Sequence, residues 1–215
     1  MTAHEILEVV TIAFNPSLQP SPSEPPLAYA AVAAQLKAAP GVQAVYVGRQ
    51  LERPSLWTVF IRWSRQADYD AFVASEAFLP WLASLKALLI DDESAEGKTL
   101  PPRHAPFKVT AAGGSFEAPL EAPTTEVFSC YGVEDGFLER NLRPFAEGLD
   151  GGAIPGYHGL AYGGYVSQGG GQPEGDTTGL FIGWDSKEAH LAQRGEDKGE
   201  IYQVLLPCCV LCAVG

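Results

Sequence analysis

Hydrophobic and polar positions in the first half of the chain alternate in a way that predicts six elements in the order β-α-β-β-α-β. The β-branched run EILEVVTIAF is typical of a strand, and LAYAAVAAQLKAA has the Ala and Leu content of a helix that Pro40 and Gly41 end. The second expected helix is long and amphipathic, and Pro80 interrupts it. The expected segments are 5–14 (strand), 27–39 (helix), 42–50 and 56–63 (hairpin strands), 64–90 (helix) and 105–112 (strand).

The second half repeats this order with a shorter last helix. The expected segments are 124–133 (strand), 135–149 (helix), 157–166 and 178–184 (hairpin strands), a short helix from Ser186, and 204–215 (strand). Between the halves, GGSFEAPLEAP has Gly and Pro but no periodicity, which is typical of a linker. We therefore expect a first repeat at 1–112, a linker at 113–123 and a second repeat at 124–215.

Two short phrases occur in both halves and in the same order. FIRW, from Phe60, matches FIGW, from Phe181, and each follows a Pro-Gly pair and a hairpin. A β-α-β-β-α-β unit places two helices on one face of a four-stranded antiparallel sheet and leaves the other face bare. A second copy in the same chain would cover that face.

The longer phrases FIRWSRQADYDAFVASEAF and FIGWDSKEAHLAQ resemble the dimeric α+β barrel superfamily, and within it the antibiotic biosynthesis monooxygenase type. The resemblance implies an α+β fold of two fused ferredoxin-like units whose antiparallel sheets pack as a pseudo-dimeric α+β barrel. It also implies a ligand pocket between sheet and helices. The superfamily includes cofactor-independent oxygenases, polyketide cyclases, lactone isomerases, haem-degrading enzymes and members without catalysis, so the fold does not fix the chemistry.

Charge and composition narrow the classes of partner. The formal net charge is −12 and 46% of the residues are hydrophobic, which favours a packed core and disfavours nucleic acid and anionic membrane surfaces as partners. The N-terminal stretch does not have the pattern of a signal peptide, and we expect a cytoplasmic protein. No metal site is expected, because Cys209 and Cys212 lie in a strand-like run where residues three apart point to opposite faces.

Histidine is the usual general acid or base near neutral pH, so the candidate catalytic residues are His158, His190 and Tyr162. His190 stands where the first repeat has Tyr69. His158, Leu160 and Tyr162 are expected on the same face of one strand, so His158 and Tyr162 are two side chains apart along that face. The alternative for each histidine is a surface or capping role. The candidate substrate-binding residues are Trp63, Trp184, Arg62, Tyr69 and Tyr131, with core anchoring as the alternative for the tryptophans and solvent exposure as the alternative for Arg62.

These observations predict a cofactor-independent enzyme that acts on a hydrophobic aromatic or polyketide-like molecule by proton abstraction, with oxygenation, cyclisation or isomerisation as the outcome, in secondary metabolism. The alternative is a non-catalytic small-molecule-binding or stress-related barrel protein. A third hypothesis is haem binding, with His190 as the candidate ligand. The expected partner is a hydrophobic small molecule, no cofactor is expected, and the chain is expected to be a monomer (a pseudo-dimer) or a homodimer.

Overall fold

The computed structural model describes residues 5–90, 107–166 and 173–193. The chain divides into two compact units, Met1–Lys108 and Val109–Gly215, and each is described by itself. Strand β4 (Phe107–Gly114) begins in the first unit and continues in the second. The stretch 113–123, expected to be a linker, contains a short helix, α4 (Glu117–Glu121).

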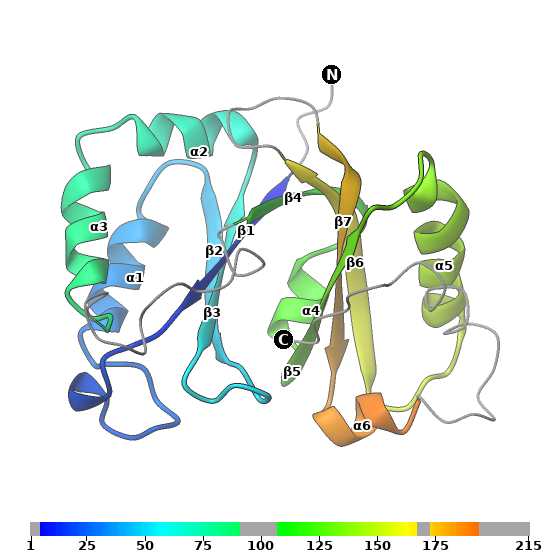
Figure 1. Cartoon of the computed structure of the whole chain (residues 1–215), viewed down its shortest axis with the longest axis horizontal. Coiled ribbons are helices and arrows are strands. Elements are labelled where there is room, and N and C mark those ends of the chain that lie inside the picture. Colours follow the sequence, from blue (N-terminus) through cyan, green and yellow to red (C-terminus); the bar gives the residue numbers. More distant parts are fainter. Residues whose placement is uncertain (1–4, 91–106, 167–172, 194–215) are drawn as a thin grey trace. The chain divides into compact units, whose positions relative to one another are not determined.

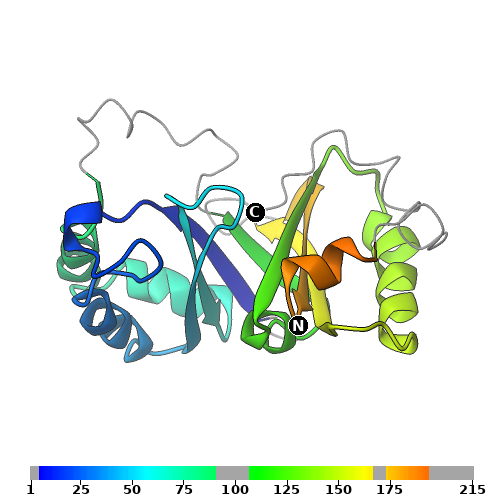
Figure 2. The same ribbon diagram turned by 90° about the horizontal axis from the view of Figure 1, so that it is seen from below.

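In the first unit, strand β3 pairs antiparallel with both β1 and β2, which gives the order β2-β3-β1. The helices lie together on one side of these strands (Figures 1 and 2). The elements are β1 (Ile6–Ile12), η1 (Pro16–Leu18), α1 (Tyr29–Lys37), β2 (Val42–Arg49), β3 (Trp57–Trp63), α2 (Gln66–Val73) and α3 (Phe78–Lys86).

The long helix expected over 64–90 is two helices with a break between them. Helix α2 ends at Val73 and α3 begins at Phe78, so Pro80 lies in the first turn of α3. A proline is tolerated there because its missing N–H has no partner within a helix's first turn. The expected interruption is confirmed, and it lies a few residues before the proline.

The core of the first unit lies between the strands and the helices. Alternate residues of β3 point to this side, as the period of a strand requires. They pack with helix residues in one buried cluster that includes Trp57, Val59, Ile61, Trp63, Val32, Leu36 and Phe72. The intervening residues of β3 point away from the helices.

In the second unit, β7 pairs antiparallel with β5 and β6, which gives the order β6-β7-β5, and β4 lies beside β6. Helices α4 and α5 lie on opposite sides of these strands (Figure 2). The remaining elements are β5 (Thr124–Tyr131), η3 (Leu138–Leu142), α5 (Arg143–Gly151), β6 (Tyr157–Val166), β7 (Pro173–Trp184) and α6 (Lys187–Leu191).

The helix expected over 135–149 begins with a wider π-type turn, η3, before α5 continues it. Pro144 lies in the first turn of α5 and brings no backbone N–H to the junction. A proline at this point removes the regular hydrogen bond to the preceding turn, and a π-type turn is one way in which a helix accommodates the loss.

The register of the strands confirms that the two units repeat one pattern. Ile6 pairs with Trp63 in the first unit, and Thr124 pairs with Trp184 in the second. Each Pro-Gly pair also makes the same turn. The backbone carbonyl of Gly41 accepts the N–H of Ser64 at 2.8 Å, and that of Gly156 accepts the N–H of Asp185 at 2.7 Å.

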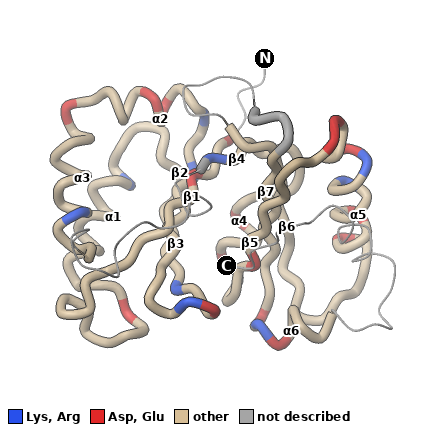
Figure 3. The backbone as a smooth tube through the Cα atoms, in the orientation of Figure 1, with Lys and Arg blue, Asp and Glu red and all other residues tan. Residues whose placement is uncertain are grey.

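The expected strand 204–215, with Cys209 and Cys212, lies outside the described residues, as do His4 and His104. Within the described ranges, no helix is long and apolar enough to cross a membrane. Figure 3 shows acidic and basic positions interspersed along the described backbone of both units.

Candidate functional site

Each unit holds a glutamate whose carboxylate accepts a hydrogen bond from the tryptophan that ends its FIxW strand. Trp63 Nε1 donates to Glu8 Oε2 at 3.0 Å, and Trp184 Nε1 donates to Glu126 Oε2 at 3.2 Å. The two tryptophans are 1% and 0% exposed, so both hydrogen bonds lie under the helix that follows the strand. The glutamates occupy equivalent positions, since Glu8 pairs with Ile61 and Glu126 with Ile182.

In the second unit, helix α6 brings His190 to this carboxylate. Nδ1 of His190 lies 2.8 Å from Oε2 of Glu126, and the two side chains are 6% and 5% exposed. The contact is short, but its direction is not that of a straight hydrogen bond, so it is a close contact between an imidazole and a carboxylate. The imidazole also stands edge-on to Trp184, with ring centroids 5.5 Å apart.

The local sequence explains why α6 points His190 inward. Ser186 caps the helix, and its hydroxyl accepts the N–H of Ala189 at 3.1 Å. The first turn then places His190 over the strand that ends at Trp184. Among the described residues, no polar atom pairs with Nε2 of His190, although this nitrogen is buried. A buried imidazole with a carboxylate at one nitrogen has the other available to accept a proton.

In the first unit, Tyr69 takes the place of His190. Its ring stands edge-on to Trp63, with centroids 5.6 Å apart and planes at 87°. Burial raises the pKa of the Tyr69 phenol, and the negative charges of Glu8 and Asp70 raise it further. The first-unit cluster therefore holds a phenol that stays protonated at neutral pH where the second holds an imidazole.

A lysine completes the first-unit cluster. Lys108 Nζ lies 3.9 Å from the centroid of the Tyr69 ring, within the range of a cation–π contact. Burial lowers the pKa of Lys108, against the attraction of Asp70 and Glu8. Burial raises the pKa of Glu8, against the hydrogen bond from Trp63 and the charge of Lys108. Both shifts favour the uncharged forms.

The structure brings together four of the residues named from the sequence, Trp63 with Tyr69 and Trp184 with His190. It missed Glu8, Glu126 and Lys108. A sequence signal for the glutamates exists, because each is followed by valine within the first strand of its repeat, as LEVV and TEVF. Each also stands at a position where alternation points toward the helices.

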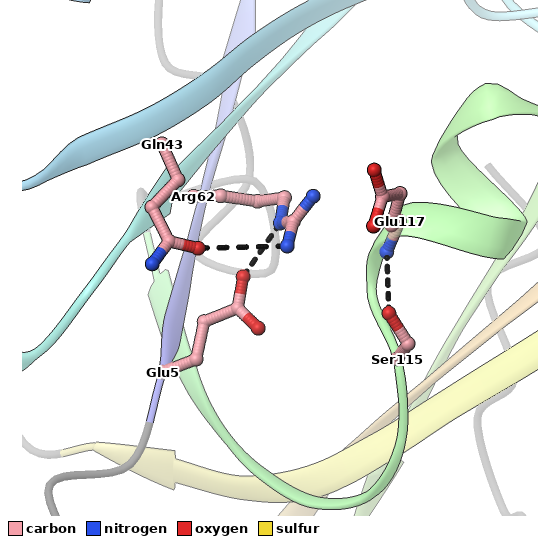
Figure 4. A network of polar contacts seen from close by, with 5 residues as sticks. All are labelled: Glu5, Gln43, Arg62, Ser115 and Glu117. Atoms are coloured by element: carbon pink, nitrogen blue, oxygen red, sulfur yellow. Dashed lines mark hydrogen bonds and ion pairs between the residues drawn. The ribbon is translucent and has the colours of Figure 1, made fainter.

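Arg62 does not join these clusters. It follows Ile61 in β3 and therefore points to the opposite side of the sheet from Trp63. Its Nε lies 2.5 Å from Oε1 of Glu5, and one of its terminal nitrogens lies 3.5 Å from Oε1 of Gln43. Figure 4 shows the guanidinium group of Arg62 in contact with both side chains. The side chain of Arg62 is 12% exposed, so the solvent-facing alternative does not describe it either.

The same figure shows how α4 begins. The backbone N–H of Glu117 donates to the hydroxyl of Ser115 at 3.3 Å (Figure 4). Buried Pro119 and Leu120 then face the strands of the second unit, and Phe116 stands edge-on to Phe181.

His158 and Tyr162 are not on one face, contrary to the sequence prediction. The register of β6 shifts between Tyr157 and Gly159, so His158 is the extra residue of a bulge. Its side chain is 40% exposed, and Nε2 lies 2.6 Å from Asp185. Tyr162 is 5% exposed, and its ring packs against the backbone of Gly113, where a Cβ would overlap it.

Tyr131 lies far along the strand from the Trp184 cluster. It pairs with Thr177, whereas Trp184 pairs with Thr124 at the other end of β5. Tyr131 is 43% exposed, and its ring stands edge-on to Tyr165, whose hydroxyl lies 2.6 Å from that of Ser129. Burial raises the pKa of Tyr165. Tyr131 and Trp184 therefore do not face one ligand within this unit.

Metal-ligating side chains do not gather in groups of three or more within the residues that the structure describes. Glu126 and His190 supply two such side chains.

Comparison with known proteins gives a family match to part of the first unit and a fold similarity along almost the whole chain. Residues 26–84, from the approach to α1 into α3, match the family described as antibiotic biosynthesis monooxygenase. No curated protein sequence matches the chain.

Three solved structures have a similar fold along almost the whole chain. A putative monooxygenase from Fusobacterium nucleatum has a TM-score of 0.63 at 10% identity, covering 99% of this chain and 89% of its own. A putative monooxygenase from Lactobacillus acidophilus gives 0.58 at 8%, covering 98% and 91%. An anthrone oxidase-like protein gives 0.57 at 15%, covering 99% and 88%. At these identities the likeness concerns the fold, and it confirms the α+β arrangement of ferredoxin-like repeats.

Proposed function

From the premise that the first unit carries an antibiotic biosynthesis monooxygenase domain, we propose that the chain is a cofactor-independent enzyme of secondary metabolism. Its substrate would be a hydrophobic aromatic or polyketide-like molecule with an acidic phenol or enol, and its setting the cytoplasm. The observation that carries the proposal is the contact of His190 Nδ1 with Glu126 Oε2 at 2.8 Å, with Nε2 buried and without a hydrogen-bond partner among the described residues.

The chemistry follows from these two side chains. Nε2 of the neutral imidazole takes the acidic proton of the substrate, and the positive charge that results lies against the Glu126 carboxylate. The indole of Trp184 donates to Glu126 and stands edge-on to the imidazole, so it helps to hold both side chains in place. The substrate carbanion then reacts with dioxygen, or it cyclises or isomerises. In the oxygenation of an anthrone, the CH₂ group becomes a ketone and one water is released for each O₂ consumed.

Anthrone is a suitable first substrate, because one similar structure is that of an anthrone oxidase-like protein. Oxygen uptake and quinone absorbance would be followed together. A positioned general base contributes about 10²–10⁴-fold to a rate, so His190→Gln should lower kcat by about that factor. Glu126→Gln should also lower kcat and shift the pH profile, because the imidazolium loses its counter-charge. Glu188→Gln, the same change at an exposed position of α6, is the matched control.

The same assay decides which of the three candidate catalytic residues, His158, His190 or Tyr162, takes part in the reaction. Unchanged turnover in His190→Gln would remove the proposed base. A loss confined to His158→Gln would move the base to the exposed bulge beside Asp185. A loss in Tyr162→Phe without a loss of stability would assign the phenol a role that its packing against Gly113 does not suggest.

The second candidate is a non-catalytic binding protein. The observation that favours it is the shortness of α6, which has five residues where the equivalent α2 has eight. Such a protein would bind planar phenols, as judged by quenching of tryptophan fluorescence, without consuming oxygen or converting the ligand. Haem binding is a third hypothesis. A Soret band that appears when haem is added to the unaltered chain, and is absent in His190→Gln, would support it.

A further inference from the structure

The first unit holds a buried amine that the proposed base chemistry does not use. Lys108, the second residue of β4, is 7% exposed. Its ammonium lies 3.9 Å from the centroid of the Tyr69 ring. Among the residues that the structure describes, no carboxylate forms an ion pair with it and no acceptor forms a hydrogen bond with it. The ammonium group thus faces the ring of Tyr69, on a side chain that is mostly removed from water.

The surroundings of Lys108 oppose the charged form. Removal from water costs an ammonium group more than a cation–π contact returns, and burial is the largest influence on its pKa, which it lowers. The acidic groups that act on Lys108 are Asp70, on α2, and Glu8, on β1. Tyr69, also on α2, faces it with its ring. A lowered pKa makes the neutral amine easier to reach, and the neutral amine is a nucleophile because it carries a free electron pair.

Glu8 is a second ionisable group in the cluster, and burial shifts its pKa in the opposite direction from that of Lys108. Burial raises the pKa of Glu8, so its carboxyl group holds a proton at higher pH than an ordinary glutamate does. Trp63 fixes this carboxyl group by donating to Oε2 at 3.0 Å. The cluster thus combines an amine whose pKa burial lowers with a carboxyl group whose pKa burial raises, beside the rings of Tyr69 and Trp63.

We propose that Lys108 is a carbonyl-reactive amine, and that the first unit therefore holds a second site, which takes a hydrophobic aldehyde or ketone. The neutral Nζ adds to the carbonyl carbon, the C=O π electron pair moves to oxygen, and a proton passes from the nitrogen, now positively charged, to that oxygen. Glu8 then donates its proton to the departing hydroxyl group and regains one from nitrogen. The products are an imine on Lys108 and one water, with no change of oxidation state.

The experiment uses the full chain with two probes, benzaldehyde and acetophenone, and traps the imine with sodium cyanoborohydride. Peptide mass mapping then reports the modified lysines. The expected result at pH 7 is at least tenfold more modification at Lys108 than at Lys37 or Lys86, which are exposed ends of α1 and α3. Glu8→Gln should slow modification of Lys108 and leave that of Lys37 unchanged.

Two variants test whether the modification depends on Lys108 and whether it is independent of His190. Lys108→Arg should abolish the selective modification, with Lys86→Arg as the matched control and circular dichroism as the check on folding. If Lys108→Arg does not fold, the ratio of modification within the unaltered chain still decides. Equal modification of all lysines, or modification of exposed lysines alone, would overturn the proposal. His190→Gln should leave labelling of Lys108 unchanged, so this outcome is independent of the base proposed in the second unit.

Discussion

At the scale of the residue, Glu8 couples the stability of the first unit to pH. An acidic group whose pKa is higher in the folded chain than in the unfolded chain stabilises the fold in its protonated form. Burial raises the pKa of Glu8 from its ordinary value of 4.5. Its contribution to stability is therefore complete below about pH 4.5 and is lost as the pH rises through the folded-state pKa.

The prediction concerns Glu8→Gln, which removes the titration and keeps an oxygen that can accept from Trp63. The free energy of unfolding of the unaltered chain, minus that of the variant, should fall as the pH rises above about 4.5 and level off once the pH exceeds the folded-state pKa of Glu8. Urea denaturation at each pH measures this difference. Glu76→Gln, at an exposed position between α2 and α3, controls for the loss of one acidic charge. A difference that rises with pH would show that Glu8 is better stabilised as a carboxylate.

The residues of the site were predictable only where they belong to a repeated phrase. Trp63 and Trp184, and then Tyr69 and His190, follow from aligning the two copies of FIxW. Glu8 and Glu126 were missed because an acidic residue in a strand ordinarily faces solvent. The strand period pointed both side chains toward the helices, and the two signals disagreed. The exposure of His158 could not be predicted, because the pattern of hydrophobic and polar residues does not reveal the bulge that adds this residue to the strand.

At the scale of the element, the Pro-Gly turns set where the second strand of each unit begins. Gly41 has φ 88° and Gly156 has φ 77°, a left-handed conformation that costs an L-residue about 1–2 kcal/mol. A Cβ at Gly41 would also overlap that of Asp68, and a Cβ at Gly156 would lie 2.8 Å from that of Ala189. Both turns therefore pack against the helix that follows the tryptophan.

We expect Gly41→Ala and Gly156→Ala each to lower the free energy of unfolding by about 1–3 kcal/mol, the sum of backbone strain and overlap. Thermal or urea denaturation measures the change. Gly48→Ala, in β2, is the control, because a Cβ there meets no atom within 4 Å and the backbone is not left-handed. Gly156→Ala should also reduce turnover, since it presses on the helix that carries His190. An equal effect of all three substitutions would show that the turns are not special.

Most elements were predictable because their period and their end signals agree. The strands β2 and β6 and the helix α1 lie within one or two residues of their expected bounds. The exceptions depend on packing that a local pattern does not encode. Helix α4 forms in a Pro- and Gly-containing stretch because Pro119 and Leu120 find a sheet to cover. The π-type turn of η3 depends on how Pro144 is fitted into a continuous helix.

At the scale of the whole molecule, we predict that the repeat makes the chain self-sufficient, that is, stable as a single subunit. The helices of the first unit cover one face of their strands, and alternate residues of β3, with Phe60 among them, point to the other face. A sheet face of this kind needs a cover, which a single-repeat protein must recruit from a second subunit. We expect the second repeat to provide that cover within one chain. Both the monomer and the homodimer remained open at the level of sequence.

We expect a monomer, with light scattering giving the mass of one chain and a thermal midpoint that does not change over a hundredfold range of concentration. A homodimer would instead gain stability by mass action, and its midpoint would rise with protein concentration. Phe60→Asp separates the two cases further. In a monomer this buried charge lowers the midpoint by the same amount at every concentration. In a dimer held by this face it also shifts the scattering mass from two chains toward one, which would contradict the self-sufficiency of the repeat.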